Sequence, residues 1–539
     1  MNGLNGVRRA LRSPQFWCCV AICAAALAAR LIPGPRTIDD AFITFRYARN
    51  LLAGSGFVYN PGEAVLGTTT PLYTLLMAGL GAPWGAANAP FPTLALVVNA
   101  LADAATCLLL IWLGKRAGAR WAGWATAAVW AVAPFSVTFA IGGLETSLYV
   151  LLLTGTTAAA LSGRRTTAAL LGALALLTRP DALILLGPLV LERAYAAFLA
   201  RPRQKLRWSE AAAFGLPVLA WGAFAALTFG SPLPNSILAK AVAYHLQPAD
   251  ALIRLIQHYA TPFLEENLLG APLAIAIGIV LYPSLCLIGS LAAFKNAPLL
   301  LPWLLYPWLY LATFALPNPL IFRWYLTPPL PAYFLLILFG MERVMAGLLR
   351  LNRKGGEGLG DRGLAPRRSG IVLAVVLIFP LIFTLSDWQM HPDHGPDQPA
   401  PEMAFIKLEL LYRQAAGRIA PLMDALSGGG SRTAPTLAAG DVGVLGFYTP
   451  ARILDTVGLN SPVSSRYYPL PADQYVINYA IPAQLILDQR PDFVVILEVY
   501  GRETLLKDAS FLQQYCLLQK IDTDMYGSDG MLIFQRTSP

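Results

Sequence analysis

Long apolar segments recur along most of this chain, and they limit its fold more than any other feature. The first extends from Phe16 to Ile32, and others follow at short intervals as far as residue 387. With 56% hydrophobic and only 13% charged residues, this succession predicts a polytopic α-helical membrane protein of about 11 spans rather than one soluble domain. After the first, the expected spans are residues 92–114, 120–140, 146–162, 166–178, 182–199, 209–230, 268–294, 297–316, 326–349 and 371–387.

Basic residues gather in the loops between alternate apolar segments. The formal net charge is +9, but no basic face of the kind that binds nucleic acid is present, so nucleic acid is not an expected partner. Loops rich in Lys and Arg stay in the cytoplasm. The clusters therefore predict a multi-pass protein of the plasma (inner) membrane, with the other loops and the C-terminus outside the cell. They are Arg8, Arg9 and Arg12; Lys115, Arg116 and Arg120; Arg164 and Arg165; residues 201–207; Lys295; and residues 350–368.

The composition changes at about residue 388. A linker rich in proline, residues 391–401, is followed by the shorter hydrophobic periods of a soluble domain. Strands are expected at 437–446, 493–497 and 531–534, and helices at 402–426 and 503–516. We therefore divide the chain into a transmembrane part, 1–387, and an extracytoplasmic α/β domain, 388–539.

A polar segment follows directly after the first apolar one. Residues 37–50 read Thr-Ile-Asp-Asp-Ala-Phe-Ile-Thr-Phe-Arg-Tyr-Ala-Arg-Asn. Their apolar members recur at the spacing of one helix face, and Gly54 can end the helix. We expect residues 39–53 to form an amphipathic helix on the outer bilayer surface, with its aromatic side in the interface. Polar chemistry at this place also favours an uncleaved anchor over a signal peptide for the preceding segment.

Two adjacent acids, Asp39 and Asp40, begin this helix. Thr37 and Asp40 fit a capping box, and acids in the first turn suit the helix dipole. Successive helical residues point about 100° apart, so the other acid is not needed for the cap. This arrangement leaves Asp39 free to face a substrate.

Several blocks of sequence resemble one family. They are residues 39–51, 56–63, 67–74, 143–146, 177–181, 234–240, 323–325 and 439–446. The first three are similar to the first outer loop of GT-C superfamily glycosyltransferases, and the chain resembles bacterial members related to the mycobacterial terminal β-(1→2)-arabinofuranosyltransferase. The resemblance implies a GT-C-like fold. It also implies inverting transfer of a monosaccharide from a polyprenyl-phosphate donor to an acceptor glycan, lipid or protein outside the membrane, with Asp39 as the base.

This reaction needs an acid–base group and a cationic site. A carboxylate can take the acceptor's hydroxyl proton, further carboxylates can stabilise an oxocarbenium-like state, and cations can stabilise a leaving phosphate. We assign Asp39 as the base, with Asp40 and Glu145 as supporting acids. The candidate phosphate ligands are Lys240, Arg323 and Arg179, and the candidate substrate-binding residues are Arg46, Tyr47, Thr69, Trp324 and Tyr325. A divalent cation is a candidate cofactor, with no ligands identified.

Several of these residues have a plainer interpretation. Glu145 can cap helix 146–162, Arg179 can pair with Asp181 across Pro180, and Lys240 can be a solvated loop residue. Trp324 and Tyr325 can be interface anchors. Asp103, inside a span, is expected to be structural and to bond Asn99 or Thr106.

Two other functions compete for the whole chain. A lipid or solute transporter would concentrate polar residues near the bilayer midplane and show repeats, whereas the polar groups here gather at one face. A polymerase or ligase of surface polysaccharide would usually have one dominant outer loop late in the chain, and the early acid pair argues against it.

Overall fold

The computed structural model describes residues 13–351, 364–428 and 434–537. Every apolar segment expected from the sequence is helical, and Pro134 divides 120–140 into two helices. The helices are α2 (Pro14–Leu31), α6 (Phe91–Ala117), α7 (Arg120–Val132), α8 (Pro134–Ile141), α9 (Thr146–Leu161), α10 (Arg165–Thr178), α11 (Leu183–Phe198), α12 (Trp208–Phe229), α16 (Ala271–Asn296), α17 (Leu301–Ala315), α18 (Leu330–Leu351) and α19 (Leu364–Leu385).

Not all of these helices are long enough to cross a bilayer unaided. In the described part of the chain, six are long and apolar enough, or seven if α7 and α8, bent by 42°, form one span. Shorter apolar helices occur at Thr146–Leu161, Arg165–Thr178 and Ala374–Leu385. The polytopic α-helical class is confirmed, and the crossing of the bilayer by the shorter helices stays a prediction.

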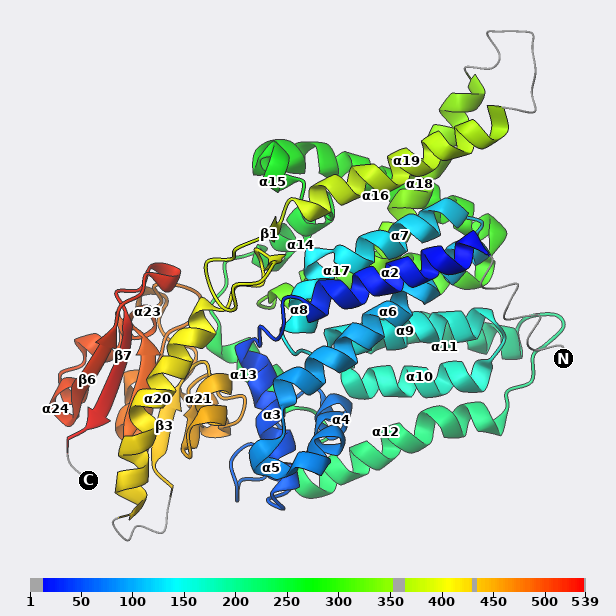
Figure 1. The fold of residues 1–539 in the computed structure, drawn as a ribbon. Coiled ribbons are helices and arrows are strands. Elements are labelled where there is room, and N and C mark those ends of the chain that lie inside the picture. Colours follow the sequence, from blue (N-terminus) through cyan, green and yellow to red (C-terminus); the bar gives the residue numbers. More distant parts are fainter. Residues whose placement is uncertain (1–12, 352–363, 429–433, 538–539) are drawn as a thin grey trace.

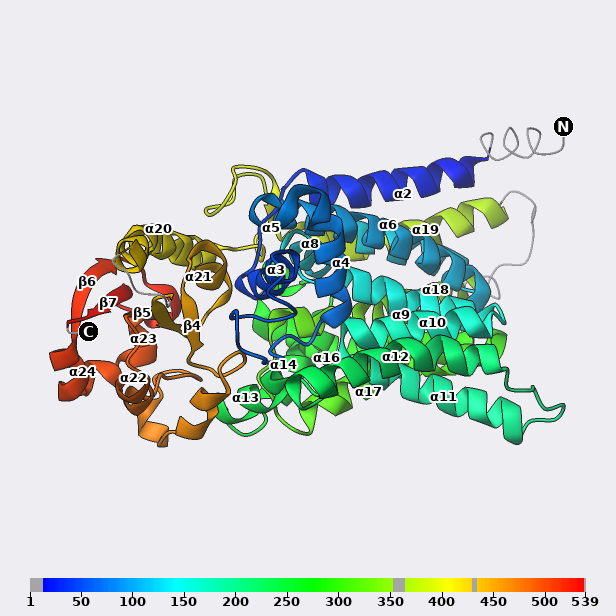
Figure 2. The ribbon, with the colours of Figure 1, turned by 90° about the horizontal axis from the view of Figure 1, so that it is seen from below.

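The helices lie side by side, and the two ends of their bundle differ (Figures 1 and 2). The beginning of α2 and the basic connection between α11 and α12 lie at one end, and the C-terminal domain lies at the other. Arg8, Arg9 and Arg12 fall outside the described residues, as does the 352–363 part of the last basic cluster. Which end faces the cytoplasm therefore stays a prediction.

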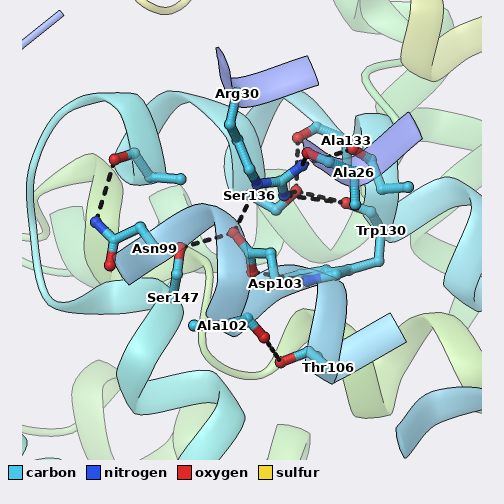
Figure 3. Close-up of polar contacts among 12 residues, drawn as sticks. Ala26, Arg30, Asn99, Ala102, Asp103, Thr106, Trp130, Ala133, Ser136 and Ser147 are labelled. Atoms are coloured by element: carbon cyan, nitrogen blue, oxygen red, sulfur yellow. Dashed lines mark hydrogen bonds and ion pairs between the residues drawn. The ribbon is translucent and has the colours of Figure 1, made fainter. Parts of the chain in front are cut away.

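Helix α2 is held in the bundle by a buried ion pair (Figure 3). Arg30 Nε donates to Asp103 Oδ2 at 2.8 Å, and both side chains are 0% exposed. The other donors to Asp103 are Nε1 of Trp130 and Oγ of Ser147. Asp103 has the structural role expected, but its predicted partners are wrong, because Asn99 and Thr106 donate to main-chain carbonyls instead.

Short helices and loops cover the bundle end next to the C-terminal domain (Figure 1). They are α3 (Asp39–Leu52), α4 (Pro71–Gly81), α5 (Gly85–Asn88), α13 (Asn235–Ala243), α14 (Asp250–Ala260), α15 (Glu266–Leu269), the 3₁₀ turn η4 (Arg323–Leu326), and the two-stranded sheet of β1 (Trp388–Gln389) and β2 (Ala400–Pro401). Helix α3 forms where expected, but most of its residues are buried. The predicted interfacial position is therefore wrong, because the C-terminal domain covers the face expected to meet lipid.

The C-terminal region is a mixed α/β structure. Its sheet has the order β4-β3-β5-β7-β6, in which β3 pairs in parallel with β4 and β5 while β7 is antiparallel to its neighbours. The elements are α20 (Lys407–Gly428), β3 (Thr436–Ala439), α21 (Gly443–Tyr448), β4 (Arg452–Asp455), α22 (Ala483–Gln489), β5 (Phe493–Leu497), α23 (Glu498–Gly501), α24 (Ala509–Gln514), β6 (Tyr515–Ile521) and β7 (Met531–Arg536).

The α/β character expected for this region is confirmed. Strand β5 has the expected bounds, and β7 contains the expected 531–534. The expected strand 437–446 is wrong beyond Ala439, where the chain leaves the sheet and forms α21.

Candidate active site

The carboxyl ends of the parallel strands face the bundle, and helix α3 meets them there. The chain leaves β3 through Gly440 and begins α21 at Gly443. The backbone N–H groups of Gly443 and Val444 donate to Asp39 Oδ2 and Oδ1 at 2.8 and 2.7 Å. Any Cβ at position 443 would lie 1.7 Å from the Asp39 carbonyl oxygen. Asp39 thus joins the bundle to the C-terminal domain.

The environment of Asp39 is that of a buried structural acid. Its side chain is 7% exposed, and burial, followed by the charge of Asp441, raises the pKa of the carboxyl well above its usual range. The predicted capping box is wrong, because Ile38 is the N-cap of α3 and no side chain caps the helix. Asp39, which we expected to be free, is therefore hydrogen-bonded. Asp40, which we expected to take part in the helix cap, does not cap the helix.

Asp40 is only half-buried and accepts no hydrogen bond from any residue that the structure describes. Its charge acts on Lys240 of α13 and on Tyr244 directly after that helix, on Glu145 in the α8–α9 turn, and on Asp441 after β3. The fold thus brings a carboxylate from α3 together with groups from three segments far apart in sequence.

Lys240 is a cation on which the charge of Asp40 acts. Its Nζ lies 4.5 Å from the ring centroid of Phe322, and it forms no ion pair within the described ranges. Burial alone would lower its pKa, but the groups Tyr325, Asp40 and Asp455 raise it. Lys240 therefore stays charged in a sheltered place, which differs from a solvated loop lysine.

Arg179 lies behind these residues with two carboxylates. It binds Asp181 through two hydrogen bonds of 2.9 and 3.0 Å, which confirms the pair across the turn. Its Nη1 is 3.5 Å from Glu145 Oε1 and is buried without a hydrogen-bond partner. The guanidinium also lies 5.0 Å from the ring centroid of Tyr325. Glu145 does not cap α9 through its side chain, so its contact with Arg179 is its principal one.

Arg46 and Tyr47 are part of the scaffold. The guanidinium of Arg46 donates to the carbonyls of Tyr59, Gly446 and Ala451, and its side chain is buried. The hydroxyl of Tyr47 donates to Val65 O and accepts from Gly67 N–H. These internal bonds occupy the polar groups that the predicted contact with substrate would need.

The other candidates come from the loop before α4 and from the 3₁₀ turn η4. Thr69 is half-buried and forms no hydrogen bond with the described residues. Trp324 stacks on Phe322 with centroids 4.7 Å apart. Arg323 is exposed and lines a cavity with Arg254, whose pKa is lowered by burial and then by Arg323.

That cavity has a volume of about 490 Å³ and lies between the bundle and the C-terminal domain. It is lined by Asp441, Glu409 and Arg254, which our sequence analysis did not single out. In the sequence, a Gly-Asp pair directly after an apolar strand could have identified Asp441 as a candidate site residue. No comparable signal marked the other two residues. Among the residues that the structure describes, no three His, Cys, Asp or Glu side chains form a metal-binding group.

Comparison with known proteins gives likenesses in structure. ArnT from Cupriavidus metallidurans bound to undecaprenyl phosphate is 15% identical, with a TM-score of 0.55 over 97% of this chain and 98% of that one. The oligosaccharyltransferase of Archaeoglobus fulgidus is 12% identical, with a TM-score of 0.54 over 90% of this chain and 69% of that one. At these identities the likeness shows a shared fold.

Comparisons of sequence match only part of the chain. Residues 412–534 match a domain of unknown function (DUF8728), which is less than half of the chain. No curated protein matches the sequence.

Proposed function

We propose that this chain, which has the fold of the GT-C glycosyltransferases, transfers a monosaccharide from a polyprenyl-phosphate donor to an acceptor glycan, lipid or protein at the outer membrane surface. The observation that carries the proposal is that the charge of Asp40 acts on Lys240. Among the described residues, Asp40 is a carboxylate without a hydrogen-bond partner, and Lys240 is a half-buried cation without an ion-pair partner. The likeness to a protein bound to undecaprenyl phosphate supports a lipid-phosphate donor.

The proposed step is a single displacement. The acceptor's hydroxyl oxygen bonds to the anomeric carbon as its proton passes to a carboxylate. The bond from that carbon to the phosphate oxygen breaks, and the electron pair leaves with the polyprenyl phosphate. Lys240 stabilises the phosphate charge, and Nη1 of Arg179, which has no hydrogen-bond partner among the described residues, is a second donor for it. Attack opposite the leaving group inverts the anomeric centre.

We assign the base to Asp40, although the resemblance in sequence assigns it to Asp39. Both oxygens of Asp39 accept backbone hydrogen bonds from α21. Asp40 has no such bonds and is more exposed. Asp39 then positions the base by docking the C-terminal domain against it, and Glu145 keeps Arg179 in place at 3.5 Å.

The test compares Asp40→Asn with Asp39→Asn in purified protein. Release of a labelled sugar from farnesyl-phosphate pentoses and hexoses is measured with octyl glycosides as acceptors, with and without EDTA. We expect Asp40→Asn to lower the rate constant of transfer by about 100-fold or more, the range for a general base, and Asp39→Asn to lower it less while reducing thermal stability.

Two outcomes would contradict the proposal in different ways, and a third would extend it. If the wild-type protein uses none of these donors, the proposed function is wrong. If Asp39→Asn removes transfer at unchanged stability while Asp40→Asn transfers normally, the base is Asp39. A loss of transfer in EDTA that Mg²⁺ or Mn²⁺ restores would add a divalent cation to the site.

A further inference from the structure

The cavity between the bundle and the C-terminal domain has the size of a ligand site. Its volume of about 490 Å³ lies within the range of about 300–1,000 Å³ typical of small-molecule pockets. Its walls come from both parts of the chain, with Arg254 and Trp324 on the bundle side and Glu409, Asp441 and Tyr500 on the domain side. Aromatic faces with a few charged groups suit a ligand that has both apolar C–H faces and hydroxyl groups.

Asp441 is held so that one carboxylate oxygen remains available. Its Oδ2 accepts hydrogen bonds from the hydroxyls of Tyr412 at 2.7 Å and Tyr500 at 3.5 Å. Its Oδ1 has no hydrogen-bond partner within the described parts of the chain, and the side chain is half-buried at the cavity wall. The residue follows β3 at the carboxyl ends of three parallel strands, which is where open α/β sheets bind ligands.

The segment that carries Asp441 docks onto α3, the helix that carries the proposed base. The charge of Asp40 is among the causes, after burial, that raise the pKa of Asp441. Two residues further along, Gly443 donates to Asp39, so the docking of α21 fixes the position of this loop relative to α3. The same cavity also has a buried hydrogen-bond donor. Arg36 lines the cavity and is 1% exposed, and its Nε has no hydrogen-bond partner among the described residues.

We propose that the C-terminal domain completes the active site by binding the acceptor: Asp441 accepts a hydrogen bond from a hydroxyl group of an acceptor sugar in this cavity. The inference rests on the proposed transfer. It gives the domain a role in recognising a carbohydrate acceptor rather than the lipid donor. A carboxylate with a fixed, available oxygen binds a sugar hydroxyl more strongly than a neutral acceptor does.

The test separates acceptor binding from donor chemistry. Slow hydrolysis of a farnesyl-phosphate sugar without acceptor measures use of the donor, and transfer to an octyl glycoside measures use of the acceptor. For Asp441→Asn we expect the acceptor KM to rise by about 10- to 100-fold, as for loss of a hydrogen bond to a charged group, while the donor KM and the rate of hydrolysis stay within about twofold. Asp424→Asn, the same change on the exposed face of α20 in this domain, is the matched control and should behave as wild type.

Tyr412→Phe provides a second variant that does not change the charge. It removes the hydroxyl that holds Oδ2 and should raise the acceptor KM by a smaller factor. The inference is overturned if both variants bind acceptor as wild type does. It is equally overturned if Asp441→Asn slows hydrolysis of the donor as much as transfer. Since both arms require that the wild-type protein uses the donor, failure of the proposed function would be seen first in the unmodified protein.

Discussion

Asp39 and Asp40 have different surroundings because consecutive helical side chains diverge by about 100°. One direction leads to the N-terminus of α21, where two backbone N–H groups hold Asp39. The other leads toward Lys240 and Glu145. The same pair can therefore provide one carboxylate, Asp39, that joins the bundle to the C-terminal domain, and one carboxylate, Asp40, that can act as the proposed base.

Lys240 gives a prediction at this scale. Lys240→Met keeps most of the packing against Phe322 but removes the charge that the proposed donor phosphate would contact. A hydrogen bond to a charged group contributes about 1.5–3 kcal/mol, so we expect the donor KM to rise by about 10- to 100-fold. Steady-state kinetics with a farnesyl-phosphate sugar measure this change. Lys520→Met, on an exposed strand where the lysine pairs with Asp529, should leave the donor KM unchanged, and an unchanged value in Lys240→Met would remove the phosphate role.

Local patterns identified the charged residues of the site better than the roles of those residues. The pair of Arg179 with Asp181 lies within one turn, and sequence spacing predicted it. The partners that Asp39 and Arg46 find in the C-terminal domain, the N–H of Gly443 and the carbonyl of Gly446, lie some 400 residues away in sequence. Sequence alone therefore predicted a capping box for the acid pair and a substrate contact for Arg46, because it does not show that the C-terminal domain lies against α3.

At the scale of elements, the contact of α3 with α21 depends on a glycine. At Gly443 a Cβ would lie 1.7 Å from the Asp39 carbonyl oxygen, whereas at Gly417 in α20 a Cβ meets no atom within 4 Å. We expect Gly443→Ala to lower the thermal unfolding midpoint and to reduce transfer, because the two helices must separate. Gly417→Ala should raise stability by about 0.5–1 kcal/mol, as for glycine in a helix interior. Thermal unfolding in detergent measures both, and equal stability of the two variants would contradict this account of the docking.

Helix α20 adds a pH-dependent contact to the same interface. Burial raises the pKa of Glu409 from 4.5 to about 7, and its Oε1 accepts the N–H of Asp39 at 3.3 Å. A raised carboxyl pKa means that the folded protein favours the protonated form. The stability from this group is complete below about pH 4.5 and is lost as the pH rises through about 7.

The matching variant is Glu409→Gln, whose amide oxygen can keep the hydrogen bond without a charge. Between about pH 4.5 and 7 we expect the unfolding midpoint of the wild type to fall relative to that of Glu409→Gln. Glu402→Gln, at an exposed site in the preceding segment, should follow the wild type. Parallel pH profiles for wild type and Glu409→Gln would show that folding does not raise the pKa of Glu409.

The elements that the sequence predicted well are those with one continuous apolar pattern. The long apolar helices and β5 belong to this group. Strand β5 is buried on both faces, and the helices are apolar on all sides, so each forms an uninterrupted apolar run. Strands β4 and β6 were missed: β4 is short, and much of β6 is exposed. In residues 437–446 a short helix follows a strand without a change in hydrophobicity, so the boundary at Ala439 had no signal in composition.

At the scale of the whole molecule, the proposed site draws on both the bundle and the C-terminal domain. The bundle would supply Asp40, Lys240 and Arg179, and the domain would supply Asp441, which lines the cavity between the two parts. The ion pair of Arg30 and Asp103 fixes α2 within the bundle, and α3 follows α2 directly in sequence. A site assembled in this way needs both parts on the same side of the membrane as the donor head group.

That requirement gives a prediction about sidedness. Cys516, on β6, is exposed, and Lys205 is an exposed residue of the basic loop at the opposite end of the bundle. In right-side-out membrane vesicles we expect a membrane-impermeant maleimide to label Cys516, and Cys516→Ser to measure the background from the other cysteines. Lys205→Cys in the Cys516→Ser background should be labelled only after the vesicles are permeabilised, because loops rich in Lys and Arg stay in the cytoplasm. The reverse pattern would place the carboxylates and the cavity in the cytoplasm, where a donor displayed on the outer leaflet could not reach Asp40.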